Sequence, residues 1–290
     1  MPTLSDNMRG AFLMAASMTA YTVNDAFLKL LGDTLPMFQV LFLRGVATVI
    51  CLICLAWAMG QLRFDLGPAG WRLTLWRAAT ETAAAYFFIA ALLNMDLANV
   101  SAILQALPLT VSLAGAIFLG EAIGWRRLSA ILIGLAGVML IVQPGSDGFT
   151  LYSLYALAAV ACVTARDLIA RRMHRSVPTL MVSIVSALGV MILGGLGLAT
   201  TEWVPVDARN WALVAGATIF ITGGYVFSVM AMRVGEIGFV SPFRYTSLLV
   251  ALILGAAIFG TFPDRLTLLG AAIVVATGLF TIWREVRAGR

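Results

Sequence analysis

The sequence predicts an all-α integral membrane protein of ten transmembrane helices, built as two inverted five-helix repeats with both termini inside. Of the 290 residues, 61% are hydrophobic and 11% are charged, whereas a soluble domain carries roughly 25% charged residues. Apolar runs of about 20 residues, the length that crosses a bilayer core, recur along the chain. The second half of the chain also repeats features of the first half at a nearly constant spacing.

The first half contains five apolar runs. We expect its helices at residues 9–31, 36–59, 75–95, 98–119 and 126–143. Gly32-Asp33 separates the first two runs, because glycine and a charged residue favour a turn in water over an apolar helix. The first run is too long for the apolar core of a cleaved signal peptide. We therefore expect it to remain as the first permanent helix.

The second half contains five more runs with similar separators. We expect its helices at residues 150–171, 178–199, 210–232, 238–260 and 265–284. Arg171 to Pro178, Thr201 to Asn210 and Gly235-Glu236 separate the first four, and Pro263-Asp264 precedes the last. Each connection is too short to hold a soluble domain. The sequence thus predicts a chain that lies almost entirely in the membrane.

Basic residues and tryptophans predict the orientation. With the N-terminus in the cytoplasm, 14 basic residues fall on the cytoplasmic side and three, Lys29, Arg209 and Arg265, on the other. Cytoplasmic loops are enriched in Lys and Arg, so both termini are expected to be cytoplasmic. All seven tryptophans fall at predicted helix ends, where interfacial aromatic residues gather.

An internal repeat divides the chain into residues 1–145 and 146–290. Tyr86-x-Phe88 recurs as Tyr225-x-Phe227, and Val100-Ser101 recurs as Val240-Ser241, with an offset near 140 residues. Five helices per repeat is an odd number, so the second copy must enter the membrane from the opposite side. Inverted repeats of this kind are typical of secondary transporters, whose sites lie near the midplane where the copies meet.

Charged residues inside the apolar runs are candidates for function, because a central charge costs roughly 2.5–3.5 kcal/mol on insertion scales. Asp25 and Arg44 lie in neighbouring runs, roughly 9 Å and 12 Å deep from the same side at 1.5 Å per residue. Lys29 follows Asp25 by about one helical turn. We expect these three residues to form a gate or an ion pair. A structural and a substrate-contacting role both stay open.

Two interrupted helices carry further polar candidates. Arg244 follows Pro242, and proline removes one helical hydrogen bond. Gln105 lies close to Pro108 at a mirrored depth in the first half. Broken helices are where transporters place substrate contacts, so Arg244 and Gln105 are expected to line a cavity. Glu81 is a further candidate on the cytoplasmic half, although it could simply reach the interface.

Tyrosines far from the predicted interfaces complete the set of candidates from the residues alone. Tyr86, Tyr225 and Tyr245 lie inside apolar runs, as does Tyr21. A buried tyrosine hydroxyl needs a hydrogen-bond partner. Each of these rings is therefore expected to face protein or a wet cavity rather than lipid, with core packing as the alternative role.

Several classes of function have no support in the sequence. It contains no H-E-x-x-H, G-x-S-x-G or phosphate-binding loop, so we expect neither an enzyme nor a cofactor. Cys51 and Cys54 form a C-x-x-C without further Cys or His nearby, and we expect packing rather than a metal site. The arginines lie in short gaps and not on a basic face, which excludes a nucleic-acid partner.

Motifs in both halves resemble the EamA domain of the drug/metabolite transporter superfamily. In the first half the matching residues are Pro108, Phe118-Leu119-Gly120-Glu121, Gly134, Gly137 and Val138. In the second they are Pro242, Tyr245, Gly255, Phe259-Gly260, Leu266 and Gly270. The resemblance covers nearly the whole chain and implies a ten-helix carrier that moves metabolites without nucleotide hydrolysis. The chain departs from the family at Gly260-Thr261, where Gly-Glu is frequent.

A finer resemblance is to the alphaproteobacterial members that include S-adenosylmethionine carriers. The matching residues are Asn24-Asp25, Lys29, Arg44, Asp167 and Pro242-Phe243-Arg244-Tyr245. Other members of the superfamily export amino acids, and both kinds of substrate carry an α-amino and an α-carboxyl group. The resemblance therefore implies a zwitterionic substrate and adds Asn24 to the expected cavity.

Together these features predict a secondary transporter of the bacterial inner membrane that exports amino acids, including aromatic or other neutral ones, by alternating access. We expect the cavity to be lined by Arg244, Gln105, Tyr86, Tyr245, Glu81, Asn24 and Tyr225. Uptake of S-adenosylmethionine or a related metabolite is the alternative, and a passive channel is the rival from another class. The expected partners are the substrate and the lipid bilayer, with the chain as a monomer or a weak homodimer.

Overall fold

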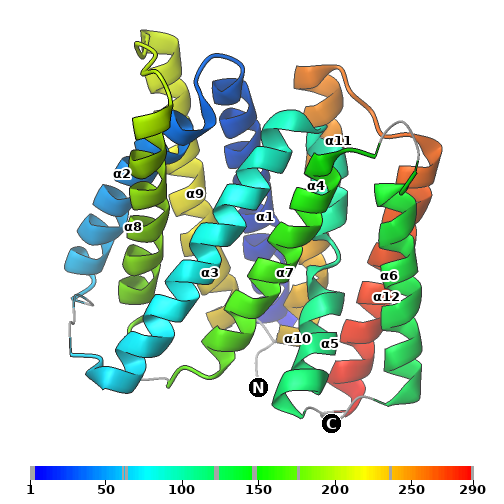
Figure 1. Ribbon diagram of the computed structural model, residues 1–290. Coiled ribbons are helices and arrows are strands. Elements are labelled where there is room, and N and C mark those ends of the chain that lie inside the picture. Colours follow the sequence, from blue (N-terminus) through cyan, green and yellow to red (C-terminus); the bar gives the residue numbers. More distant parts are fainter. Residues whose placement is uncertain are drawn as a thin grey trace.

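The computed structural model describes residues 4–60, 62, 65–120, 124–145, 149–174, 177–234 and 237–288, and their regular structure is entirely helical (Figure 1). The first half contains α1 (Leu4–Gly32), α2 (Met37–Ala58), α3 (Gly67–Asn94), α4 (Leu97–Leu104), α5 (Leu107–Leu119) and α6 (Trp125–Val142). The second contains α7 (Leu151–Arg171), α8 (Thr179–Gly197), η1 (Leu198–Thr200), α9 (Ala208–Val234), α10 (Ile237–Val240), η2 (Ser241–Tyr245), α11 (Thr246–Phe259) and α12 (Arg265–Ala288). Glu121, Gly235-Glu236 and residue 146 of the expected repeat boundary lie outside the described residues.

The composition and length of the helices show a multi-pass membrane protein. Within the described residues, seven helical stretches are long and apolar enough to cross a bilayer: Met37–Ala58, Leu97–Leu119, Leu151–Arg171, Thr179–Thr200, Ala208–Ser228, Pro242–Phe259 and Arg265–Trp283. Large apolar side chains such as Phe12, Ile117 and Leu196 are exposed on the outside of the bundle. Lipid is the solvent that makes such an exterior favourable.

Two of the expected helices are interrupted at their prolines. The run expected at 98–119 forms α4 and α5 with Gln105 and Ala106 between them, and Pro108 lies in the first turn of α5. The run expected at 238–260 forms α10, η2 and α11, and Pro242 lies in the first turn of η2. Proline has no N–H to donate to the preceding turn, and its ring crowds the carbonyl there.

The third helix begins earlier than the apolar pattern predicts. We expected it from residue 75, whereas α3 begins at Gly67, with a proline in its first turn. Proline suits this position because the first N–H groups of a helix have no partner within the helix. The first turns of α3 carry tryptophan and arginine and are less apolar than the rest, so the hydropathy pattern missed them. The earlier start places Arg77 in the third turn of α3.

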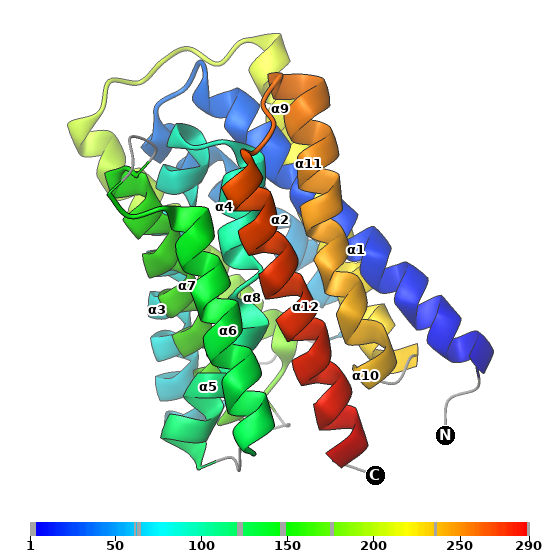
Figure 2. The ribbon, with the colours of Figure 1, turned by 90° about the vertical axis from the view of Figure 1, so that its right-hand side faces the viewer.

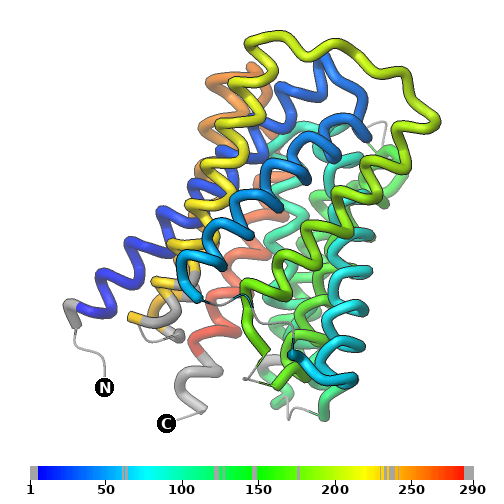
Figure 3. The backbone as a smooth tube through the Cα atoms, turned by 90° about the vertical axis from the view of Figure 1, so that its left-hand side faces the viewer, coloured from blue at the N-terminus to red at the C-terminus, as the bar shows by residue number. Residues whose placement is uncertain are grey.

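The main helix contacts join the two halves of the chain. The most extensive contacts pair α1 with α9, α3 with α7, α2 with α8 and α6 with α12 (Figures 1 and 3). Buried apolar clusters fill the spaces between these pairs. One cluster joins Ile103 and Ile131 of the first half to Val274 of the second, and another joins Leu28 to Val214. Neither half therefore buries its apolar surface alone.

The two ends of the bundle differ. α1 begins and α12 ends at the same end, called the terminal end below, and the opposite end is called the far end (Figures 1 and 2). Polar contacts cross the far end between segments that are distant in sequence. They join Thr34 Oγ1 to Asn210 Oδ1 at 3.0 Å, Gln39 Nε2 to the Val204 carbonyl at 2.6 Å, and Gln143 Nε2 to Asp264 Oδ2 at 2.7 Å.

The Gln143–Asp264 contact at the far end is reinforced by a second hydrogen bond to the Asp264 carboxylate. The carboxylate accepts hydrogen bonds from Gln143 Nε2 and from the Thr267 backbone N–H, each at 2.7 Å. The Gln143 bond and then the Thr267 bonds hold the pKa of the Asp264 carboxyl below its usual value. A lowered pKa favours the ionised form, so this far-end contact persists until the pH falls through that lowered pKa.

Candidate functional site

A cavity of about 500 Å³ lies between the two halves, towards the terminal end. Its wall is built by α1, α2, α3, α7, α8, α9 and η2. The polar and charged side chains in the wall are Tyr21, Arg44, Thr48, Arg77, Glu81, Arg166, Asp167, Ser183, Ser186, Thr222, Tyr225, Ser228 and Arg244. The volume falls within the roughly 300–1,000 Å³ of small-molecule sites.

The cavity wall carries more positive than negative charge. Four arginines from α2, α3, α7 and η2 face two carboxylates, Glu81 of α3 and Asp167 of α7. The formal excess is thus two positive charges. Arginine is always charged in proteins and presents a planar fork of donors that matches a carboxylate. This wall is therefore suited to a solute that carries at least one anionic group.

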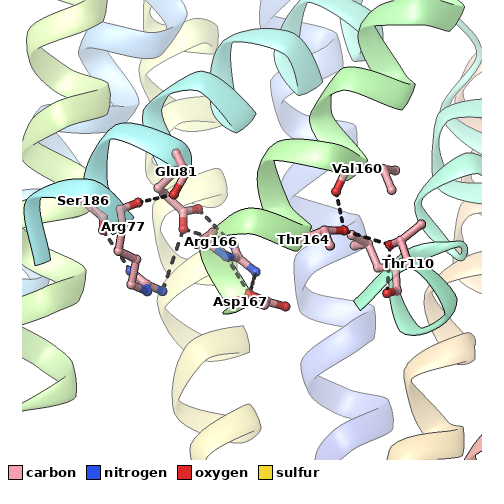
Figure 4. Close-up of polar contacts among 10 residues, drawn as sticks. Arg77, Glu81, Thr110, Val160, Thr164, Arg166, Asp167 and Ser186 are labelled. Carbon is pink, nitrogen blue, oxygen red and sulfur yellow. Dashed lines mark hydrogen bonds and ion pairs between the residues drawn. The ribbon is translucent and has the colours of Figure 1, made fainter. Parts of the chain in front are cut away.

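An ionic chain links α3, α7 and α8 on one side of the cavity (Figure 4). Arg166 Nη1 donates to both Glu81 carboxylate oxygens at 3.2 Å and 3.1 Å. Its Nε and Nη2 reach Asp167 Oδ1 at 2.9 Å and 2.8 Å. Arg77 Nη2 lies 3.8 Å from Glu81 Oε2, while its Nη1 donates to Ser186 Oγ at 2.9 Å. The charges of this chain are thus satisfied within the protein.

Arg44 and Arg244 differ from the arginines of that chain. Within the described residues, neither guanidinium donates a hydrogen bond to the protein or forms an ion pair within 4.0 Å, although both line the cavity. Arg44 has Asp25 and Glu81 as longer-range electrostatic partners. Arg244 is exposed, and Tyr21 lies in the same cavity wall. These two groups are consequently available to an anionic ligand.

The candidate Tyr21 of α1 lies in the wall of this cavity, and so do four residues expected to line a cavity or form the ion pair: Arg44, Glu81, Tyr225 and Arg244. The structure brings these four together from α2, α3, α9 and η2, which are far apart along the chain. Asn24 and Asp25 lie elsewhere on α1, and Asn24 Nδ2 donates to Asp25 Oδ1 at 2.9 Å. No ion pair within 4.0 Å joins Asp25 to Arg44 in the described part of the chain.

The remaining expected residues have other surroundings. Gln105 is buried behind η2, and its Nε2 donates to Ser247 Oγ at 2.8 Å. Tyr245 is buried against α12, whereas Tyr86 packs in an aromatic group with Phe38, Phe87 and Tyr155. Lys29 lies at the far end and donates to the carbonyls of Leu92 and Met95 at 2.9 Å and 2.6 Å.

The sequence analysis missed most of the ionic chain. Arg77 and Arg166 belong to the 14 basic residues counted as cytoplasmic, and Asp167 entered only through the resemblance to S-adenosylmethionine carriers. Arg77 belongs to the third turn of α3 because that helix begins at Gly67. Arg166 lies five residues before the end of α7 at Arg171. The available signal was an acidic residue directly after an arginine inside an apolar run, which implies a paired site rather than a loop.

The described residues contain no group of His, Cys, Asp and Glu side chains that could hold a metal ion. The donor set of the cavity is dominated by guanidinium and hydroxyl groups. Guanidinium groups bind anions and do not bind metal cations. The donors of the cavity wall therefore favour an anionic group on the solute.

A profile of the EamA-like transporter family matches residues 8–143 and again residues 150–283. This chain belongs to the EamA-like transporter family. The two matches cover both halves of the helical bundle, and the cavity of this EamA-like transporter lies between them. The members of the family are transporters rather than enzymes.

Curated relatives of this EamA-like transporter carry different solutes. An S-adenosylmethionine uptake transporter of Rickettsia felis is 24% identical over 96% of this chain and 93% of its own. A pseudopaline exporter of Pseudomonas aeruginosa is 26% identical over 92% and 93%, and a riboflavin transporter of Vibrio cholerae is 29% identical over 65% and 63%. The family is thus shown, and the solute of this chain is not.

A solved crystal structure shares the fold. It superposes with a TM-score of 0.66 over 97% of this chain and 99% of the other, at 19% sequence identity. At this level of identity the likeness concerns the fold alone. It shows that the overall arrangement of the helices occurs in a solved structure.

Proposed function

We propose that this chain is a ten-pass carrier of the bacterial inner membrane, with both termini in the cytoplasm, that moves amino-acid-like metabolites by alternating access. The ten passes are α1, α2, α3, α4 with α5, α6, α7, α8, α9, α10 to α11, and α12. Two inverted repeats at residues 1–145 and 146–290 are supported by the helix contacts. In the two repeats α7 is the counterpart of α1, and α9 is the counterpart of α3. The contact of α1 with α9 therefore corresponds to the contact of α7 with α3, as the repeat requires.

The observation that carries the substrate class is the pair of arginines in the cavity wall that have no acceptor among the described residues. A substrate carboxylate can accept hydrogen bonds from Arg44 and Arg244, which line one cavity. An α-amino group needs a carboxylate, and Glu81 and Asp167 are the acidic residues in the wall. Charge-assisted hydrogen bonds of this kind are shorter and about twice as strong as neutral ones.

Export of amino acids is the first form of this proposal. Tyr21 and Tyr225 lie in the wall beside the charged groups. Aromatic faces favour apolar and aromatic side chains through stacking and edge contacts. Neutral and aromatic amino acids combine such a side chain with the required head group.

Uptake of S-adenosylmethionine or a related metabolite is the second candidate. The cavity of about 500 Å³ is large for a single amino acid, because sites of a few hundred Å³ hold drug-sized ligands. Four relatives from Rickettsia, each matched over at least 96% of this chain, are named S-adenosylmethionine uptake transporters. S-adenosylmethionine carries the same α-amino and α-carboxyl groups.

Transport by the purified protein in liposomes tests the proposal. Labelled phenylalanine and labelled S-adenosylmethionine are supplied in separate assays, with unlabelled solute inside the vesicles. A carrier predicts uptake that saturates with solute concentration and is accelerated by internal solute. Flux that rises linearly without limit would instead indicate a passive channel, and no flux of any amino acid or of S-adenosylmethionine would contradict the proposed substrate class.

Replacing Arg244 by Ala tests the assigned carboxylate contact. A lost charge-assisted hydrogen bond is worth about 1.5–3 kcal/mol, so KM is expected to rise about 10- to 100-fold. Arg209→Ala is the matched control, since Arg209 is an exposed arginine of α9 outside the cavity wall. Unchanged transport by folded Arg244→Ala protein would remove Arg244 from the site.

A further inference from the structure

We propose that Gln105 and Ser247 are positioning residues that hold Arg244 in the cavity wall by joining the two helix breaks. Gln105 lies between α4 and α5, and Ser247 lies in the first turn of α11, directly after η2. Neither residue lines the cavity. The inference deepens the proposed function and rests on it only for its transport readout.

The contact is a two-step hydrogen-bond chain. Gln105 Nε2 donates to Ser247 Oγ at 2.8 Å, and Ser247 Oγ donates to the Arg244 carbonyl at 3.0 Å. A serine hydroxyl has one proton to donate and two lone pairs to accept with, so both bonds can form together. The chain thus links the side chain at one helix break to the backbone of the cavity arginine at the other.

The backbone at the second break needs such support. Pro242 cannot donate to the preceding turn, and the segment from Ser241 to Tyr245 forms a 3₁₀ helix, whose hydrogen bonds have poorer geometry than those of an α-helix. Thr22 of α1 approaches from another side, with Oγ1 3.4 Å from the Ser247 carbonyl. Side chains from α1 and from the α4–α5 break therefore converge on the residue that contacts Arg244.

The residue after Arg244 is fixed by packing. The Tyr245 ring lies against Gly278 of α12, where a Cβ atom would be 2.7 Å from Tyr245 Cζ. Any side chain larger than that of glycine at position 278 would clash with the Tyr245 ring. With Tyr245 held by α12 and the Arg244 carbonyl held by Ser247, η2 has one orientation, which directs the Arg244 side chain into the cavity wall.

Thiol reactivity at position 244 tests the positioning without any transport. Cys51, Cys54 and Cys162 are first replaced by Ala, and Arg244→Cys is added to place one thiol in the wall. A small water-soluble methanethiosulfonate modifies this thiol in purified protein. Adding Gln105→Met, which keeps the size and removes the donor, is expected to slow modification at least fivefold.

Thr110→Val is the matched control for this reactivity. Thr110 Oγ1 forms a buried bond of 2.8 Å to Thr164 Oγ1 from α5 to α7, remote from η2. Its loss is expected to leave the modification rate at position 244 unchanged. Ser247→Ala is the second variant, so the test remains available if Gln105→Met fails to fold. An equal rate with and without the Gln105–Ser247 bond would overturn the inference.

A double-mutant cycle gives the transport readout, with labelled phenylalanine and labelled S-adenosylmethionine as probes. Gln105→Met alone is expected to raise KM about three- to tenfold, the equivalent of one lost hydrogen bond, with little change in kcat. In an Arg244→Ala background the same change is expected to have no further effect on KM. Additive effects in the two backgrounds would show a general structural role and contradict positioning.

The two readouts separate this inference from the proposed function. Slower thiol modification together with no flux of either probe would support positioning and contradict the proposed substrate class. Saturable flux of the probes with an unchanged modification rate would support the proposed substrate class and contradict the positioning by Gln105 and Ser247. Thiol modification and probe flux are both measured on the whole chain.

Discussion

Glu81 is the shared acceptor of the ionic chain, because Arg77 and Arg166 both reach its carboxylate. The side chains of Glu81 and Arg166 remain 28% and 24% exposed to the cavity, so their attraction is partly screened by water. The pair still joins α3 of the first half to α7 of the second. Its main effect is to fix two facing helices while leaving Arg44 and Arg244 available.

Replacing Glu81 by Gln is expected to destabilise the protein by about 2 kcal/mol, since hydrogen bonds to charged groups contribute roughly 1.5–3 kcal/mol. Thermal unfolding in detergent measures the change. Arg166 keeps Asp167 as a partner when Glu81 is lost, so the double variant Glu81→Gln with Arg166→Gln is expected to lose less stability than the sum of the two single losses, because both changes remove the same pair. Strictly additive losses would contradict the pairing.

At the residue scale, a lone charge inside an apolar run pointed to the cavity better than paired charges did. Arg44 and Arg244 are the lone charges of their runs, and both lie in the cavity wall, whereas Glu81 shares its run with Arg77 and pairs with it. Arg166 and Asp167 are adjacent and near a helix end, so hydropathy assigned them to the interface. Gln105 was expected in the cavity and instead contacts Ser247. Such placement depends on helix rotation, which the apolar pattern of a nearly uniformly apolar helix does not determine.

At the scale of elements, α6 and α12 pack through glycine. A Cβ atom at Gly270 would lie 2.5 Å from the Gly137 carbonyl oxygen and 2.8 Å from Ile141 Cγ1. The two backbones therefore approach as closely as small residues allow, as in other membrane helix pairs. The sequence did not indicate which helices meet, because partner choice depends on the fold of the whole chain.

Gly270→Val is expected to destabilise the protein by about 1–3 kcal/mol through overpacking. Gly223→Ala in α9 is the control, since a Cβ atom there meets nothing within 4 Å. Thermal unfolding of both variants measures the difference. Equal stability of the two variants would contradict the close approach of α6 and α12.

The element boundaries follow the same physical logic. Pro108 and Pro242 marked both interruptions correctly, because the effect of proline on a helix is local. The start of α3 at Gly67 was missed, since a helix outside the apolar core needs no apolar residues. Local chemistry therefore predicted where helices break, and hydropathy predicted only the parts that face lipid.

At the scale of the whole molecule, the cavity lies towards one end and contacts close the other. Because α1 packs on α9 and α3 packs on α7, we infer that each pair moves as a unit. The α1–α9 pair and the α3–α7 pair then separate and approach each other around the cavity. Lys29 of α1 crosses between them at the far end, where it donates to the Leu92 and Met95 carbonyls at the end of α3. Opening the far end must break these bonds.

A disulfide between α1 and α3 at the far end tests alternating access most directly. A Cβ atom at Gly32 would lie 3.1 Å from Leu93 Cγ, which is bonded directly to Leu93 Cβ. The positions are therefore close enough for Gly32→Cys with Leu93→Cys, in protein without native cysteines, to approach the roughly 3.5–4.5 Å Cβ–Cβ spacing of a disulfide. Lys29 stays in place. Transport into liposomes is then measured after oxidation and again after reduction. The account predicts that oxidation abolishes transport and reduction restores it, whereas full transport by the oxidised protein would contradict it.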